Sequence, residues 1–294
     1  MDETNMVIIN FRPVDTTLIS GGKIAVWLSK LLGVKIVDRY LEPIPHDVTI
    51  VTGGCALYCT FRETLAEVVK HSKRVIWIVN DCTTEPPQVI QQLGKQIECW
   101  STFKSCPHPG RKIWNFMNFT QCMNWNLVVW NPQPLIPYTE SGLLYYGAYR
   151  VGREDLFNKY LAGPHTVHIS CTPRNSKKFA DVGTFMHWPT FKECAFELQK
   201  FQASIYIEDK ISRVRYTSPA NRFYECLSAG IPLWIDRSCM LNLQQYPIDP
   251  AWVVDSAKDI YWGDTADMAH AQPELRPQIE FELSDLATQV KAHI

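Results

Sequence analysis

The chain has 294 residues and a formal net charge of −1 at pH 7, with 46% hydrophobic and 20% charged residues. This length suits two α/β domains of roughly 140 to 150 residues each, and the composition is that of a soluble globular protein. No apolar run approaches the ~20 residues of a membrane-spanning helix, so we expect no membrane segment. The acidic first residues lead directly into a strand, so we expect neither a signal peptide nor a transit peptide. We therefore expect the protein to be cytoplasmic.

Short apolar strands alternate with helices through the first third of the chain. The predicted strands span residues 6–11, 34–37, 49–51, 74–79 and 96–100, and the predicted helices begin near residues 22, 60 and 87. Such alternation is typical of a parallel, doubly wound sheet, which binds its ligands at the carboxyl ends of the strands. Loops that carry Gly21, Gly22 and Asp81 would meet at that edge.

Residues 101–141 interrupt this alternation with a segment rich in aromatic residues, Pro and Asn. Its length without periodicity indicates a functional loop that also connects two domains. A second alternating series follows, with strands at 143–146, 166–170, 204–207 and 233–235 and helices at 154–161, 191–201 and 219–229. An amphipathic helix at 283–292 comes last. We therefore predict two Rossmann-like domains and a terminal helix, at residues 1–140, 141–280 and 281–294.

Charge is distributed unevenly along the chain. Residues 141–237 carry more Lys and Arg than Asp and Glu, whereas residues 238–294 are acidic. A solvated surface explains such a pattern in many proteins, but a basic central segment also suits a polyanionic ligand such as a sugar nucleotide or a nucleic acid.

The most informative stretch is residues 217–236. Ser218 is a good N-cap for a helix over 219–229, and Gly230 can take the left-handed conformation at its end. Arg222 and Glu225 are spaced to line one face of this helix. A carboxylate thus lies about two turns into a helix whose open N–H groups can receive a phosphate.

This stretch resembles the donor-binding motif of GT-B glycosyltransferases at Pro219, Arg222, Phe223, Glu225, Ala229, Gly230 and Pro232. In that family the Glu hydrogen-bonds the ribose hydroxyls of a sugar nucleotide, and the start of the helix faces its diphosphate. The resemblance implies these roles for Glu225 and for the backbone around residues 218–221. It also implies two Rossmann-like domains that face each other across a cleft, with a terminal helix that crosses back to the first domain.

The stretch from Tyr146 to Arg150 resembles the strand–Gly–Arg start of the family's donor domain, in which the Arg meets diphosphate oxygens. Arg150 is the first candidate for that role and Arg153 is the second, since Arg forks suit phosphate. The donor-binding residues that we expect are Gly21, Gly22, Arg150, Arg153, Ser218, Ala220, Asn221, Arg222 and Glu225. An ordinary capped helix with surface arginines is the alternative interpretation.

The sequence departs from the family at Thr217, where many retaining members carry a second Glu, so the stereochemistry stays open. No Asp-x-Asp triplet occurs in the chain, which argues against a metal-dependent GT-A enzyme. Ten scattered cysteines form no Cys-x-x-Cys pair, so we expect reduced thiols rather than metal ligands. We expect no obligatory cofactor and no required metal ion.

A hydroxyl acceptor needs a base if the reaction is a direct displacement, and a carboxylate within reach is a common solution. Asp15 follows the first predicted strand and Asp81 ends the fourth, so these two are the catalytic candidates. His46 and His108 are weaker candidates. The alternative is that each Asp is an ordinary turn or capping residue.

Basic and aromatic side chains are interleaved in residues 101–119. Such a loop can follow a phosphate backbone and stack on an extruded base, although aromatic packing between domains is the alternative. The acceptor-binding candidates are Lys104, Arg111, Lys112, Trp114 and Phe116. The compact size of the chain, its soluble character, the lack of a membrane-binding helix and this loop together resemble the bacteriophage DNA glycosyltransferases that modify hydroxymethylated pyrimidines. The resemblance covers the architecture and the donor motif.

That resemblance implies a monomer in the host cytoplasm that transfers glucose from UDP-glucose to a hydroxymethylated pyrimidine in DNA. Two alternatives stay open. One is a cytosolic glycosyltransferase that acts on a polysaccharide or a small molecule. The other is a non-catalytic protein that binds a nucleotide-sugar or a nucleic acid on a degenerate GT-B scaffold.

Overall fold

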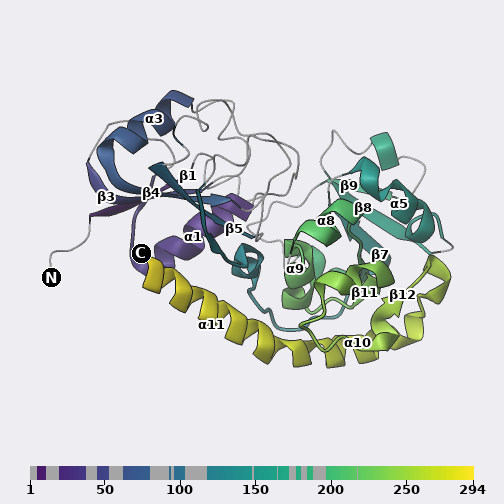
Figure 1. Ribbon diagram of the computed structural model, residues 1–294. Helices are drawn as coiled ribbons and strands as arrows, with labels where there is room; N and C mark the ends of the chain where they lie inside the picture. Colours follow the sequence, from purple (N-terminus) through teal and green to yellow (C-terminus); the bar gives the residue numbers. More distant parts are fainter. Residues whose placement is uncertain are drawn as a thin grey trace. The chain divides into compact units, whose positions relative to one another are not determined.

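The structure is a computed structural model that describes residues 5–10, 20–37, 45–52, 62–79, 93, 96–102, 118–147, 149–163, 165–171, 177–179, 184–187, 197–216 and 218–294. The chain forms two compact units (Figure 1). Unit 1 comprises Met1–Val129 and Glu282–Ile294, and unit 2 comprises Trp130–Phe281. Each unit contains one parallel sheet, so the predicted α/β fold with two Rossmann-like halves is confirmed.

The sheet of unit 1 has the strand order β2-β1-β3-β4-β5-β6. The strands are β1 (Met6–Asn10), β2 (Ile36–Val37), β3 (His46–Thr52), β4 (Ser72–Val79), β5 (Ile97–Ser101) and β6 (Asn118–Cys122). Helix α1 (Ser20–Leu32) contacts β1 and the 3₁₀ turn η4 (Trp125–Val129), and helix α3 (Arg62–His71) contacts β4. The carboxyl-terminal halves of β3 and β4 are buried, and that of β4 is a continuous apolar run, as is usual where both faces of a parallel sheet are covered.

Strand β6 differs from the sequence-based expectation, which places no strand between residues 101 and 141. Its side chains alternate between exposed and half-buried because, among the strands that the structure describes, β6 pairs with β5 alone and forms the edge of the sheet. An edge strand needs no continuous apolar run, so its periodicity gives a weak signal. The helix expected at residues 87–93 lies almost entirely outside the described residues.

The sheet of unit 2 has the order β12-β11-β10-β7-β8-β9. The strands are β7 (Glu140–Tyr146), β8 (Val167–Cys171), β9 (Thr184–His187), β10 (Phe201–Tyr206), β11 (Leu233–Asp236) and β12 (Val253–Val254). The chain first adds β8 and β9 on one side of β7 and then adds β10 to β12 on the other. The order therefore reverses between β7 and β10, and doubly wound sheets bind ligands beyond the strand ends at such a switch point.

Helices α5 (Glu154–Tyr160), α8 (Lys210–Arg215), α9 (Asn221–Ala229) and α10 (Thr265–Ala271) belong to unit 2. The sequence predicts Ser218 as the N-cap of α9, but the N-cap is Ala220. The Ala220 N–H donates a hydrogen bond of 2.9 Å to the hydroxyl of Tyr206, and this contact favours the extended backbone of the residue before the helix. The predicted end is confirmed, because Gly230 is left-handed with φ of 68°.

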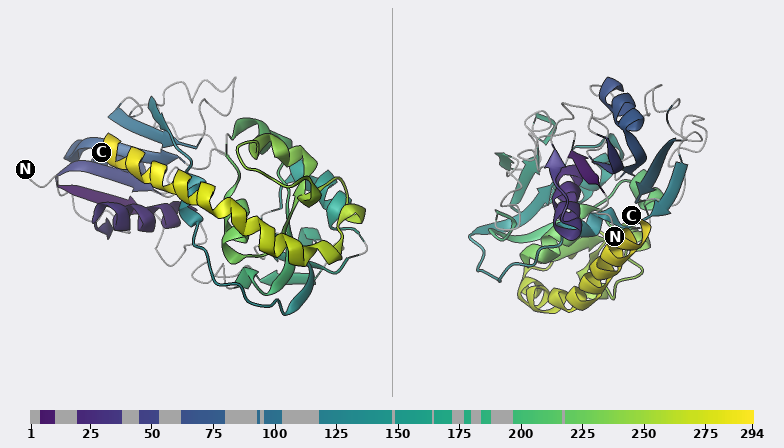
Figure 2. Two further views of the ribbon diagram at one scale, coloured as in Figure 1. Left: turned by 90° about the horizontal axis from the view of Figure 1, so that it is seen from below. Right: turned by 90° about the vertical axis from the view of Figure 1, so that its left-hand side faces the viewer.

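The last helix, α11 (Arg276–His293), has 18 residues and begins before the predicted start at residue 283. Its final turns lie beside the sheet of unit 1 (Figure 2). There Arg74 donates a hydrogen bond of 3.2 Å to the carbonyl of Ile294, and the rings of Trp100 and His293 meet edge to face at 6.3 Å. Among the helices of the described ranges, none combines the length and the apolarity that crossing a membrane requires.

Candidate functional site

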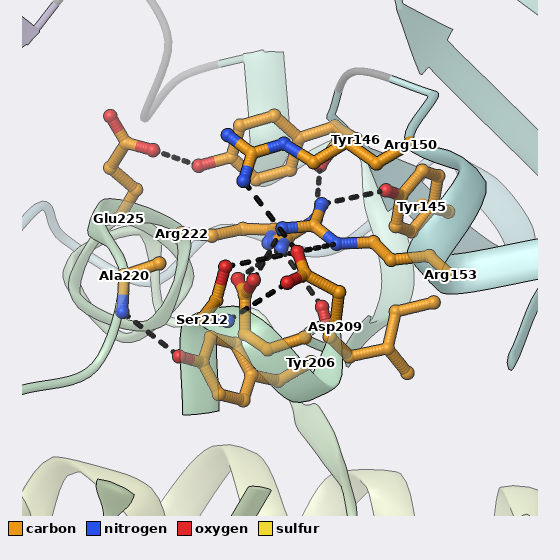
Figure 3. Close-up of polar contacts among 12 residues, drawn as sticks. Tyr145, Tyr146, Arg150, Arg153, Tyr206, Asp209, Ser212, Ala220, Arg222 and Glu225 are labelled. Carbon is orange, nitrogen blue, oxygen red and sulfur yellow. Dashed lines mark hydrogen bonds and ion pairs between the residues drawn. The ribbon is translucent and has the colours of Figure 1, made fainter. Parts of the chain in front are cut away.

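A cluster of charged side chains lies at the carboxyl ends of β7 and β10, where the strand order of unit 2 reverses (Figure 3). The 3₁₀ turn η5 (Val151–Arg153) follows β7 and ends in Arg153, and Glu208 and Asp209 follow β10. Helix α9 contributes Arg222 from its first turn. Three elements that are distant in the sequence thus place two buried arginines and two carboxylates together.

Glu208 bridges the two arginines. One carboxylate oxygen contacts Arg153 and the other contacts Arg222, and the three side chains are only 5–7% exposed. Burial by itself raises the pKa of Glu208, but the two guanidinium groups outweigh burial and hold that pKa below its ordinary value. Glu208 is therefore ionised at neutral pH and compensates part of the charge of two buried cations.

Arg222 also joins the ends of the two central strands. It donates hydrogen bonds to the carbonyl of Tyr146 at 3.1 Å and to the carbonyl of Ile207 at 2.9 Å. Gly147 allows this approach, because a Cβ at that position would lie 2.7 Å from Nη1 of Arg222. The φ of Gly147 is +154°, a conformation that side chains with a Cβ rarely adopt. We infer that glycine here is required by the position of the guanidinium.

Asp209 has both a structural and an electrostatic role. As the N-cap of α8 it accepts hydrogen bonds from the N–H and the hydroxyl of Ser212, at 2.8 and 2.9 Å. Burial raises its pKa, yet these bonds and the nearby Arg153 hold that pKa below its ordinary value. Nη1 of Arg150 lies 3.6 Å from Asp209, but 39% of the Arg150 side chain is exposed. Within this cluster, Arg150 is the arginine that a ligand reaches with the least rearrangement.

The charges of the cluster leave an excess of positive charge. The guanidinium groups of Arg150, Arg153 and Arg222 face the two carboxylates of Glu208 and Asp209, which gives a net charge of +1. Positive charge in surroundings of low dielectric constant attracts an anion more strongly than the same charge in water does. The cluster therefore suits an anionic ligand.

Glu225 lies in the second turn of α9 with an exposed fraction of 6%, and one of its oxygens accepts a hydrogen bond from the hydroxyl of Tyr146. Near the start of the same helix, Ser218 Oγ and Asn221 Oδ1 are buried and have no hydrogen-bond partner among the described residues. The first turn of a helix leaves backbone N–H groups without intrahelical partners. These N–H groups and the hydroxyl of Ser218 can donate hydrogen bonds to a phosphate, whereas Asn221 Oδ1 can only accept one.

The structure gathers seven of the expected donor-binding residues at this edge of unit 2, namely Arg150, Arg153, Ser218, Ala220, Asn221, Arg222 and Glu225. Gly21 and Gly22 instead lie buried in the first turn of α1, in unit 1. Among the other candidates, His46 is the first residue of β3, at the amino end of the strand. The remaining ones lie outside the described residues, namely Asp15, Asp81, His108, Lys104, Arg111, Lys112, Trp114 and Phe116.

Three members of the site are absent from the sequence-based expectation: Glu208, Asp209 and the hydroxyl of Tyr146. A signal for the first two exists, because adjacent acidic residues directly after a buried strand of a doubly wound sheet lie at its ligand-binding edge. The contact of Tyr146 with Glu225 has no comparable signal, since it joins residues 79 positions apart.

Metal ligation has no support within the described ranges, where no group of three or more His, Cys, Asp or Glu side chains is arranged to hold an ion. The cysteines described there, at positions 99, 122, 171, 226 and 239, are free thiols. Burial raises the pKa of Cys171 to about 11 and that of Cys226 to about 12. These two thiols therefore stay protonated and unreactive at neutral pH.

Solved structures resemble the whole chain. T4 phage β-glucosyltransferase in complex with UDP-glucose matches with a TM-score of 0.66 and 13% identity, over 98% of this chain and 95% of that one. An α-glucosyltransferase in complex with UDP and a 13-mer DNA that contains an HMU base matches with a TM-score of 0.55 and 8% identity, over 97% and 95%. The chain has the GT-B fold.

A third GT-B structure, the T4 phage enzyme in complex with UDP and Mn²⁺, matches with a TM-score of 0.54 and 12% identity, over 98% of this chain and 95% of that one. No protein-family model and no curated protein sequence matches the chain. At such identities the likeness shows the fold. Within the GT-B fold, the charged cluster occupies the switch point of the second Rossmann-like half.

Proposed function

We propose that the protein is a glycosyltransferase that moves glucose from UDP-glucose to the hydroxyl of a hydroxymethylated pyrimidine in DNA. The observation that carries this proposal is the net positive cluster at the switch point of unit 2, beside a helix that presents a buried carboxylate. The GT-B structures that resemble the chain support the donor and the acceptor, since they hold UDP-glucose in one case and DNA with an HMU base in another.

The donor is proposed to bind with its diphosphate between Arg150 and the start of α9. Arg150 is partly exposed and ends in a guanidinium that suits a phosphate. Ser218 carries a buried hydroxyl without a partner among the described residues, and this hydroxyl can donate to a phosphate oxygen. Arg153 and Arg222 are already paired with Glu208, so they contribute mainly positive potential. Glu225 is proposed to accept hydrogen bonds from the ribose hydroxyls.

The proposed reaction is a transfer to the acceptor hydroxyl. The acceptor oxygen bonds to the anomeric carbon of glucose, and the bond from that carbon to the diphosphate oxygen breaks. UDP leaves with the electron pair, and the hydroxyl proton passes to a carboxylate. Asp15 and Asp81 are the proposed bases, and Lys104, Arg111, Lys112, Trp114 and Phe116 are the proposed contacts to DNA.

The proposal is tested by incubating the protein with a panel of UDP- and GDP-sugars and following nucleotide release. We expect UDP release from UDP-glucose to rise at least about tenfold when hydroxymethylated duplex DNA is added. Unmodified duplex of the same sequence is the control and gives no such rise. Transfer to sugars or small molecules without a DNA effect would favour the other acceptor class, and the absence of any nucleotide binding would overturn the donor site.

A second expectation concerns metal ions. We expect transfer to persist in EDTA, because Arg150, its neighbouring arginines and the start of α9 supply the positive charge that a divalent cation provides elsewhere. Initial rates are measured in EDTA and again after addition of Mg²⁺ or Mn²⁺. A strict requirement for the ion, restored when the ion is added back, would contradict this electrostatic scheme.

A further inference from the structure

Glu225 is a buried carboxylate whose orientation is fixed by its neighbour. The residue is 6% exposed, and Tyr146, at the end of β7, is 3% exposed. The Tyr146 hydroxyl donates a hydrogen bond to Oε2 of Glu225. Figure 3 shows the other carboxylate oxygen turned away from Tyr146. A rigid aromatic ring on a central strand thus holds one end of a flexible side chain on a helix.

A carboxylate accepts about four hydrogen bonds, so Glu225 can bond a ligand hydroxyl in addition to the phenol of Tyr146. An unrestrained Glu side chain loses rotamer freedom when a ligand orders it, and that loss weakens binding. The hydrogen bond from Tyr146 already restricts the rotamers of Glu225 in the absence of a ligand, so less rotamer freedom is lost on binding. Glu225 is therefore already oriented before a ligand arrives.

We propose that Tyr146 is a positioning residue that orients Glu225 toward the ribose and thereby sets the preference for ribonucleotides over 2′-deoxyribonucleotides. The inference rests on the proposed function, because it assigns Glu225 to the ribose of the donor. A site built to bond a substrate hydroxyl rejects the analogue that lacks it, since a buried polar group is then left unpaired. Glu225 keeps its bond from Tyr146 with either nucleotide, but it is buried, so water does not readily replace the hydrogen bond of the missing ribose hydroxyl.

The test compares the dissociation constants of UDP and 2′-deoxy-UDP by calorimetry in the wild type and in Tyr146→Phe. The wild type is expected to prefer UDP by at least about tenfold. The variant loses one hydroxyl and is expected to narrow this preference about fivefold, mainly through weaker UDP binding. If Tyr146→Phe does not fold, Glu225→Asp is measured instead. It withdraws the carboxylate from the hydroxyl of Tyr146 by one methylene and is expected to narrow the preference for UDP as well.

Tyr224→Phe is the matched control. Tyr224 is also buried, lies on α9 beside Glu225, and shares a hydrogen bond of 2.9 Å with the hydroxyl of Tyr246. Its loss is expected to leave the ratio of the two dissociation constants unchanged.

The possible failures are distinguishable. If the wild type binds no UDP, the proposed function itself is overturned. If it binds UDP but Tyr146→Phe keeps the full preference, or weakens both nucleotides equally, Tyr146 has only a structural role and the inference is overturned.

Discussion

Replacing Glu208 by Ala is expected to lower the free energy of unfolding by about 3–5 kcal/mol, the usual cost of removing one partner from a buried ion pair. The substitution leaves Arg153 and Arg222 without the carboxylate that contacts both of them in a buried environment. Urea denaturation at neutral pH measures the effect. Binding of pyrophosphate is expected to restore part of the loss, because an added anion then meets the uncompensated charge.

The control for this prediction is Glu98→Ala in unit 1. Glu98 also pairs with an arginine, at 2.6 Å from Nε of Arg74, but the two side chains are 26% and 30% exposed. We expect a smaller loss there because water screens the remaining charge. A loss for Glu208→Ala no greater than that for Glu98→Ala would contradict the assigned role of Glu208.

The pH dependence of the same variant has a defined sign. The folded-state pKa of Glu208 lies below its ordinary value, so its stabilising contribution is present above the unfolded-state pKa and is lost as the pH falls through the folded-state value. The difference in unfolding free energy between wild type and Glu208→Ala is therefore expected to be largest near neutral pH and to shrink in acid.

Replacing Arg150 by Gln is expected to reduce kcat/KM for UDP-glucose about 10²-fold while leaving the unfolding free energy nearly unchanged. Arg150 is partly exposed, and its ion pair with Asp209 is long at 3.6 Å, so its loss disturbs little of the folded protein. Steady-state kinetics with hydroxymethylated DNA and a thermal melt measure the two effects.

Arg237→Gln provides a comparison within unit 2. Arg237 is 62% exposed and pairs with Asp255 at 2.7 Å. We expect its substitution to change neither kcat/KM for UDP-glucose nor the unfolding free energy appreciably. If Arg150→Gln binds UDP as tightly as the wild type, the diphosphate lies elsewhere and the donor site must be reassigned.

Much of the fold was predictable because each central strand is a short apolar run and turn residues separate the runs. Strand β6 was not, because an edge strand carries polar residues. The start of α9 was also misassigned, since Ser218 has the chemistry of an N-cap but the helix begins after Ala220, whose N–H is bonded to Tyr206.

The arginine cluster shows where prediction from sequence stops. Arg153 and Arg222 have the residue type and position expected of phosphate ligands, and that role stays a proposal. Their common partner Glu208 follows β10, which pairs with β7 although β8 and β9 come between them in the sequence. The sequence can place Glu208 at the ligand-binding edge after β10, but local patterns do not give the strand order, so its pairing with these two arginines is visible only in the folded chain.

The assignment of Glu282–Ile294 to unit 1 bears on the order in which the protein takes shape during synthesis. Unit 2 is a single uninterrupted stretch, Trp130–Phe281, so a ribosome delivers all of its residues before those of the last turns of α11. Unit 1 begins first and is completed last, when His293 reaches Trp100 and Ile294 reaches Arg74. Domains generally fold as units as they emerge. Unit 1 therefore gains its last contacts only after every residue of unit 2 has been synthesised.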